Sequence, residues 1–199
     1  MAYTIYETKA IILGCRPVQE HDMFLRVFSN VFGYISIVAK GTRKSTSKLR
    51  GSISEYTVAI LGVVKGKEMF RLTDARQIFS FTQSRSVVSF LRASEKLFYS
   101  HEEEFGLQTH EHIYNMMLRL CKLLVYVVTY NTDFSRQDVQ DFFTVFVRGE
   151  QGFLPKVSWG NGYTIEDFFN LSDDQVCMWL ESNKQVVTDL LRKDRERVG

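Results

Sequence analysis

The chain has 199 residues, of which 45% are hydrophobic and 14% aromatic, so it can bury one or two cores and is not an intrinsically disordered polypeptide. Its net charge of +2 hides an asymmetry, because residues 1–82 hold 12 Lys and Arg against 6 Asp and Glu, whereas residues 83–199 hold 13 against 17. The basic charge, a net +6, therefore belongs to the first 82 residues, and the remainder is acidic at −4.

Five short runs in the basic segment have the composition of β-strands: residues 3–13, 23–29, 34–40, 56–64 and 69–79. Gly33 and Gly66 lie in the breaks where hairpin turns need glycine, which predicts that the second run pairs with the third and the fourth with the fifth. Five strands in about 80 residues fit a small closed barrel, and the OB-fold is the common nucleic-acid-binding barrel of this size.

The second run alternates between two kinds of side chain. One face carries Phe24, Arg26 and Phe28, and the other carries Met23, Leu25 and Val27. An aromatic face with a cation can stack nucleic-acid bases. The alternative is that these phenylalanines are core residues, as most are in a small barrel.

The third run leads directly into a basic loop. The segment 33–51 contains no acidic residue and places five cations among Gly, Ser and Thr: Lys40, Arg43, Lys44, Lys48 and Arg50. Cations and hydroxyl groups on a surface loop can bind the phosphates of a polyanion. A basic loop that is merely solvated is the alternative.

After residue 82 the apolar spacing changes from two residues to 3.6, which predicts helices. A first stripe contains Val87, Leu91, Leu97 and Phe98. A second, clearer stripe contains Ile113, Met116, Met117, Leu120, Leu124, Val127 and Val128. These patterns predict an all-helical region over residues 83–199.

Two further helices have recognisable N-termini. Ser135 followed by Asp138 is typical of an N-cap, and Ser172 followed by Gln175 matches a capping box. Residues 149–162 contain Pro and several Gly residues and are expected to form an irregular connector. The sequence thus predicts an α+β chain with a barrel domain over 1–82 and a helical domain over 83–199.

The cysteines and histidines do not form a metal-binding pattern. Cys15, Cys121 and Cys177 are odd in number and far apart, and His110 and His112 point to different faces of a helix. We therefore expect no bound zinc and no other cofactor. A reducing cytoplasm fits this cysteine usage.

The sequence offers no targeting or membrane signal. Glu7 and Lys9 precede any apolar run, and Arg119 and Lys122 interrupt the most apolar helix candidate. We expect a cytoplasmic protein without a membrane span.

No catalytic constellation can be assembled, so we expect a protein that is not an enzyme. The segment 62–68 superficially resembles a phosphate-binding loop, but it has three residues between its glycines and ends in Glu68, and it is read as a hairpin turn. Three consecutive carboxylates at 102–104 fit a solvated turn better than a general acid–base pair.

The order of residues in the first segment resembles that of the RecO recombination-mediator family. The resemblance lies in residues 8–13, 16–22, 32–41 and 44–49, and Ala39-Lys40-Gly41 with the basic loop after it is the most specific part. A weaker likeness continues to Gly152-Phe153-Leu154-Pro155. There the chain departs from many relatives, which continue with two Cys-x-x-Cys pairs that can hold zinc, and it is also shorter at the C-terminus.

The resemblance implies an OB-fold and a helical domain in a DNA repair protein. Such proteins bind single- and double-stranded DNA without sequence preference, anneal complementary strands, and help load recombinase with RecR onto DNA coated with single-stranded-DNA-binding protein. They act in the cytoplasm at the nucleoid. The resemblance assigns DNA contacts to Lys40, Arg43, Lys44, Lys48 and Arg50, with Arg16 and Arg71 as weaker additions.

Two acidic residues in the matched segment, Glu20 and Asp22, are expected to have a structural role because carboxylates repel phosphate. A different class of function stays open from the residues alone. The barrel can be an RNA- or protein-binding module without annealing activity, with the acidic helical region as its main interaction surface.

Overall fold

The computed structural model describes residues 3–49, 51–100, 111–130, 135–151, 154 and 165–198. Contacts divide the chain into two units, Met1–Asn115 and Met116–Gly199, which we treat separately. This division lies further along the chain than residue 82, because the first helix makes its contacts with the barrel. The boundary at residue 82 stays a prediction about independent folding.

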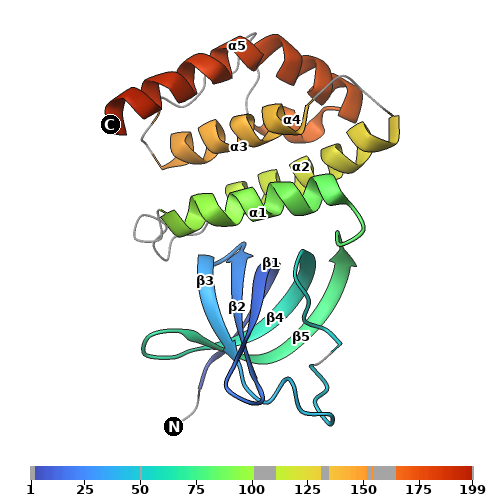
Figure 1. The fold of residues 1–199 in the computed structure, drawn as a ribbon, viewed down its shortest axis with the longest axis vertical. Helices are drawn as coiled ribbons and strands as arrows, with labels where there is room; N and C mark the ends of the chain where they lie inside the picture. Colours follow the sequence, from blue (N-terminus) through green and yellow to red (C-terminus); the bar gives the residue numbers. More distant parts are fainter. Residues whose placement is uncertain are drawn as a thin grey trace. The chain divides into compact units, whose positions relative to one another are not determined.

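Five strands lie among the described residues of the first unit: β1 (Ile5–Val18), β2 (Asp22–Ser29), β3 (Gly33–Ala39), β4 (Thr57–Lys65) and β5 (Phe70–Ser80). They form a closed barrel in the order β1-β2-β3-β5-β4 (Figure 1). The predicted hairpins are confirmed, since β2 pairs antiparallel with β3 and β4 with β5. A five-stranded OB-like barrel followed by helices confirms the predicted α+β class.

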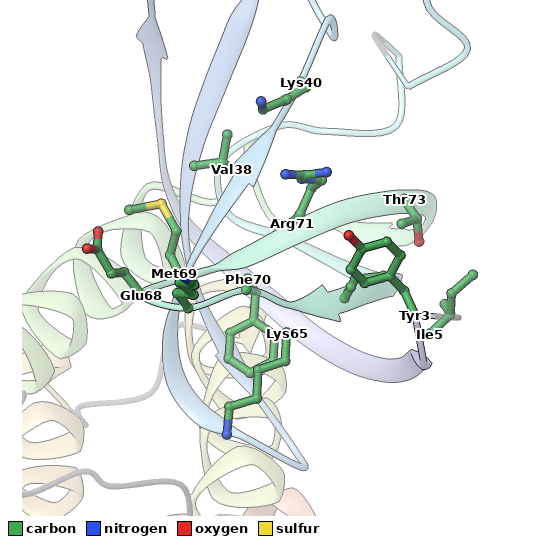
Figure 2. A pocket seen from close by; sticks show the side chains of 13 residues that line it. Tyr3, Ile5, Val38, Lys40, Lys65, Glu68, Met69, Phe70, Arg71 and Thr73 are labelled. Atoms are coloured by element: carbon green, nitrogen blue, oxygen red, sulfur yellow. The ribbon is translucent and has the colours of Figure 1, made fainter. Parts of the chain in front are cut away.

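The barrel closes at a short parallel seam between β3 and β5. Ile37 pairs with Phe70 and Val38 with Arg71. The end of β3 therefore lies beside the start of β5, where Val38, Phe70 and Arg71 are drawn (Figure 2). Two segments far apart in sequence, the residues after Ala39 and the β4–β5 turn, meet at this seam.

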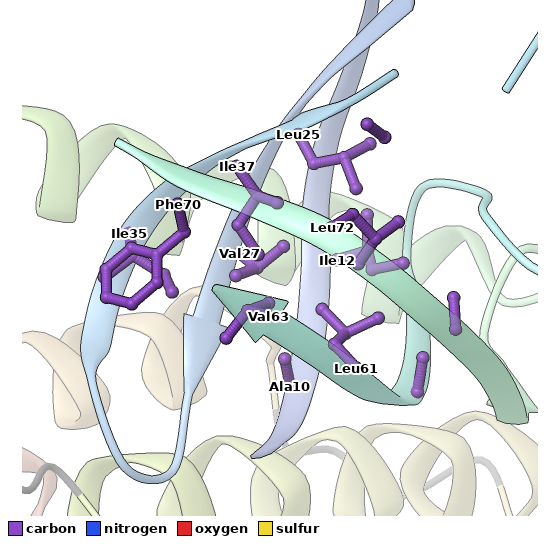
Figure 3. Packing of buried hydrophobic residues seen from close by; sticks show 13 residues of the cluster. Ala10, Ile12, Leu25, Val27, Ile35, Ile37, Leu61, Val63, Phe70 and Leu72 are labelled. Carbon is purple, nitrogen blue, oxygen red and sulfur yellow. The ribbon is translucent and has the colours of Figure 1, made fainter. Parts of the chain in front are cut away.

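Alternate residues of the strands fill the barrel interior. Leu25 and Val27 of β2 are fully buried, and Met23 packs against the same cluster. Burying each such side chain contributes about 1.5–3 kcal/mol. The cluster consists of Ala10, Ile12, Leu25, Val27, Ile35, Ile37, Ala39, Ala59, Leu61, Val63, Phe70, Leu72 and Ala75 (Figure 3).

Helix α1 (Arg85–Ser100) contacts two side chains of β2, Phe28 and Arg26. The Phe28 ring, fully buried, lies 4.5 Å from the Phe98 ring between centroids. The guanidinium of Arg26 donates to Glu95 at 3.2 Å. Of the predicted base-stacking face, Phe28 is thus a core residue, as the alternative held, and Arg26 is engaged with the helix.

The helices that follow are α2 (Glu111–Tyr130), α3 (Arg136–Glu150), α4 (Ile165–Asn170) and α5 (Asp173–Val198). Both predicted N-termini are confirmed. The Ser135 hydroxyl accepts from the Asp138 amide in a capping box, and the Ser172 hydroxyl accepts from the Gln175 amide at 3.3 Å. Helix α4 was not predicted, because six residues are too few to show a periodic stripe.

Helices α3 and α5 are joined by charged groups as well as by apolar packing. Arg148, 5% exposed, donates through Nε and Nη2 to both carboxylate oxygens of Asp194, each at 3.1 Å. A two-bond pair of this kind offsets the desolvation free energy that burying the guanidinium would otherwise cost.

None of the helices in the described ranges is long and apolar enough to cross a bilayer.

Candidate nucleic-acid interface

The basic loop begins with a turn that is anchored to the β1–β2 connection. Gly41 has a φ of +65°, a conformation that glycine adopts without strain, and its amide donates to Asp22 Oδ1 at 2.7 Å. The Arg43 amide donates to the carbonyl of His21 at 3.0 Å. The structural role expected for Asp22 is therefore confirmed, since its carboxylate holds the start of the loop.

The far side of the loop is held by apolar contacts. Leu49 and Ile53 are partly buried and pack against the barrel core. The chain between these two anchors is short, so its cations stay at the barrel surface rather than on a free tail.

The loop cations reach solvent. Lys40, Arg43, Lys44 and Lys48 are exposed, and no ion pair joins Lys40, Lys44 or Lys48 to another described residue. Arg43 is partly engaged, because its guanidinium donates to the carbonyl of Glu20 at 3.2 Å. Arg50 lies outside the described residues.

A groove of about 770 Å³ opens at the barrel seam, lined by residues from the N-terminus, the end of β3 and the β4–β5 hairpin. We call it the seam groove. Four cations line it, Lys40, Lys65, Lys67 and Arg71, with Glu68 as the acidic residue among its described lining. The structure thus brings together two of the predicted cations, Lys40 and Arg71, which are distant in sequence.

The rest of the seam groove is largely apolar. Tyr3, Ile5 and Met69 line it and are 73%, 63% and 39% exposed. Figure 2 shows the Arg71 guanidinium between Lys40 and the Tyr3 ring in this view. The groove therefore combines exposed apolar side chains with cations, a combination that suits nucleic acid because bases are apolar on their faces and phosphates are anionic.

The β4–β5 turn is tight, as the hairpin prediction requires. The Gly66 amide donates to the Met69 carbonyl at 3.0 Å, and a Cβ on Gly66 would lie 2.5 Å from that oxygen. Only glycine fits here without a shift of the backbone. The turn presents Lys65 and Lys67, which sequence reasoning passed over as turn residues. Two cations flanking the glycine of a hairpin were the signal that could have found them.

Arg16, a weaker candidate, lies on β1 rather than in a turn, because β1 continues past an irregularity between Ile12 and Gly14. Its guanidinium lies over the Phe24 ring, 4.5 Å from the centroid. This contact occupies the half-buried Phe24, the remaining aromatic residue of the predicted stacking face.

A second cavity of about 340 Å³ contains Arg16, away from the lining of the seam groove. Arg26 and Arg92 also line it, together with the carboxylates Glu55 and Glu95, so its positive charge is only partly balanced. Burial, with the nearby Glu55 and Glu95, raises the pKa of the Cys15 thiol to about 12. Cys15 is therefore protonated at neutral pH and is a poor nucleophile.

Within the described residues, no cluster of three or more Cys, His, Asp or Glu side chains could hold a metal ion. His110 and the carboxylates at 102–104 lie outside those residues.

The segment that forms the barrel is similar to known proteins. Residues 1–81 match the sequence family described as "Recombination protein O N terminal". The chain is also similar to proteins named "DNA repair protein RecO" from Clostridium kluyveri, 32% identical over 71 residues, Gloeothece citriformis, 34% over 70, and Heliobacterium modesticaldum, 34% over 71.

These matches cover part of each protein. They span 36%, 35% and 36% of this chain and 28%, 25% and 26% of the three relatives. The likeness therefore concerns the barrel, and the matched segment is about a quarter of the length of those relatives.

The Asp22 anchor gives a first prediction. Asp22→Ala removes the acceptor of the Gly41 amide, and the loss of a hydrogen bond to a charged group costs about 1.5–3 kcal/mol. We expect hydrogen exchange of the Gly41 amide, followed by NMR, to speed up roughly tenfold or more, since about 1.4 kcal/mol is a factor of ten. Asp22→Asn, which keeps an Oδ1 acceptor, should have a smaller effect. Unchanged Gly41 exchange in Asp22→Ala would contradict the anchor.

Proposed function

We propose that the protein is a DNA repair protein of the recombination-mediator type, because residues 1–81 match the family described as "Recombination protein O N terminal" and are similar to proteins named "DNA repair protein RecO". It binds single- and double-stranded DNA without sequence preference and anneals complementary strands. It also helps load recombinase, together with a RecR-like protein, onto DNA covered by single-stranded-DNA-binding protein. The observation that carries this proposal is the array of exposed cations that runs from the anchored basic loop into the seam groove.

Electrostatics supports binding without sequence preference. Lys40 belongs both to the basic loop and to the lining of the seam groove, so the two surfaces are continuous. Lysine ammonium groups that release counterions from phosphates bind any sequence, with an affinity that falls as salt rises. The side chains proposed to contact DNA are Lys40, Arg43, Lys44, Lys48 and Arg50, with Arg71 in the groove and Arg16 as a more distant addition.

Annealing needs no chemistry in this account. Two complementary strands repel each other through their phosphates, and a basic surface that neutralises both lowers that repulsion. The barrel carries the cations for this, since residues 1–82 have a net charge of +6. The acidic region 83–199 is proposed to bind protein partners.

The basic loop gives the second prediction. Replacing Lys44, Lys48 and Arg50 by Ala should weaken binding to all DNA sequences alike, and each lost phosphate contact should remove roughly 0.7 from the log–log salt slope for single strands and 0.9 for duplex. Fluorescence anisotropy at several salt concentrations measures both.

The control for this experiment removes the same charge elsewhere on the barrel unit. Lys9, Arg76 and Lys96 are exposed and lie outside the loop and the groove lining, so the variant Lys9→Ala/Arg76→Ala/Lys96→Ala should keep a steeper slope than the loop variant. Equal salt slopes for the two triple variants would show that the loop cations are not part of the DNA interface.

The third prediction separates a mediator from a simple binding module. Full-length protein should speed the annealing of complementary fluorophore-labelled oligonucleotides by roughly tenfold or more at low salt, without ATP or metal, through charge neutralisation. The loop triple variant should lose most of this acceleration. Protein that binds single strands but leaves the annealing rate unchanged would support the alternative, an OB-fold binding module without annealing activity.

A further inference from the structure

We propose that the seam groove holds a single strand of nucleic acid with its bases against Tyr3, Ile5 and Met69, and that it thereby selects unpaired strands. The basic loop, in contrast, contacts phosphates of paired and unpaired strands alike. This inference rests on the proposed function and names the substrate class of one part of the interface.

The exposed apolar side chains are the first reason. Tyr3 and Ile5 are 73% and 63% exposed beside a set of cations, and Met69 at the hairpin tip is also exposed. In a duplex the base faces are stacked on each other and cannot reach such side chains. Unpaired bases can, because every base has a π-face that stacks on an aromatic side chain.

The placement of the cations is the second reason. Figure 2 shows Lys40 and Arg71 on one side of the hairpin and the Lys65 ammonium group pointing away from them. A single small anion cannot contact cations that are spread in this way. A chain of phosphates can, with its bases turned toward the apolar part of the groove.

Continuity with the basic loop favours nucleic acid over an acidic peptide. Lys40 is the first cation of the loop and also lines the groove. A polyanion seated in the groove therefore meets more cations as it leaves. The hydroxyl-rich stretch that contains Lys44 offers further donors to phosphate oxygens.

The test compares three ligands of equal length on the full chain: an oligothymidylate, an abasic strand with the same phosphates, and a duplex. Wild-type protein should bind the oligothymidylate more tightly than the abasic strand. The variant Tyr3→Ala/Met69→Ala should bind the oligothymidylate roughly tenfold more weakly. Its affinity for the abasic strand and the duplex should be unchanged.

Two matched variants control for general effects on the barrel. Tyr3→Phe keeps the ring and should keep the preference for the oligothymidylate. Ile78→Ala/Phe79→Ala removes apolar side chains that are 52% and 54% exposed on β5 outside the groove lining, and it should leave all three affinities unchanged.

Three outcomes would overturn the inference. Equal wild-type affinity for the oligothymidylate and the abasic strand would mean that bases contribute nothing. An equal loss for all three ligands in Tyr3→Ala/Met69→Ala would mean that the groove does not distinguish unpaired bases. The third outcome uses an Asp-rich peptide ending in Phe as a competitor, in the case where the bases contribute nothing to binding. If this peptide displaces the strand from wild-type protein but not from Tyr3→Ala/Met69→Ala, the groove is assigned to a protein partner.

The loop triple variant, assayed in parallel, separates this inference from the proposed function. If the loop variant weakens binding of all ligands and the groove variant weakens none, DNA binding stands and the groove assignment fails. If neither variant weakens binding, the groove assignment and the proposed DNA-binding surface both fail.

Discussion

The closure of the barrel between β3 and β5 is the constraint on which the candidate interface depends. The parallel pairing of Ile37 with Phe70 and of Val38 with Arg71 completes the barrel. Ile37 and Phe70 belong to the buried core, so hydrophobic burial holds the seam in place. As a result, the segment after β3 and the hairpin before β5 meet, and the cations they carry line one groove.

The same architecture explains how a basic surface can persist on a small domain. Like charges repel, and a flexible loop would spread them apart. Here the loop is held at its start by the Asp22 carboxylate and near its end by Leu49 against the core. Burial of the apolar interior stabilises the folded barrel. The surface cations are therefore not needed for folding and are available for binding.

Much of the barrel could be predicted because its signals are local. Short strand-like runs separated by turn-like breaks predicted all five strands, and Gly33 and Gly66 in those breaks predicted both hairpins. The helix caps at Ser135 and Ser172 follow from short-range hydrogen bonds. Other features depend on tertiary contacts. The contact of Phe98 with Phe28 keeps α1 with the barrel, and no local pattern contains that contact. The seam groove escaped prediction because Lys65 and Lys67 line one groove with Lys40 only when the barrel closes.

Hydrogen–deuterium exchange of the full chain with and without a single-stranded oligothymidylate tests the central claim most directly, because it reports every segment at once. The account predicts slower exchange in residues 3–5, 40–49 and 65–71, the segments that meet at the seam, with residues 76–80 at the other end of β5 unchanged. Protection confined to the helices of residues 111–198, or found at residues 76–80 and absent from the seam, would contradict it.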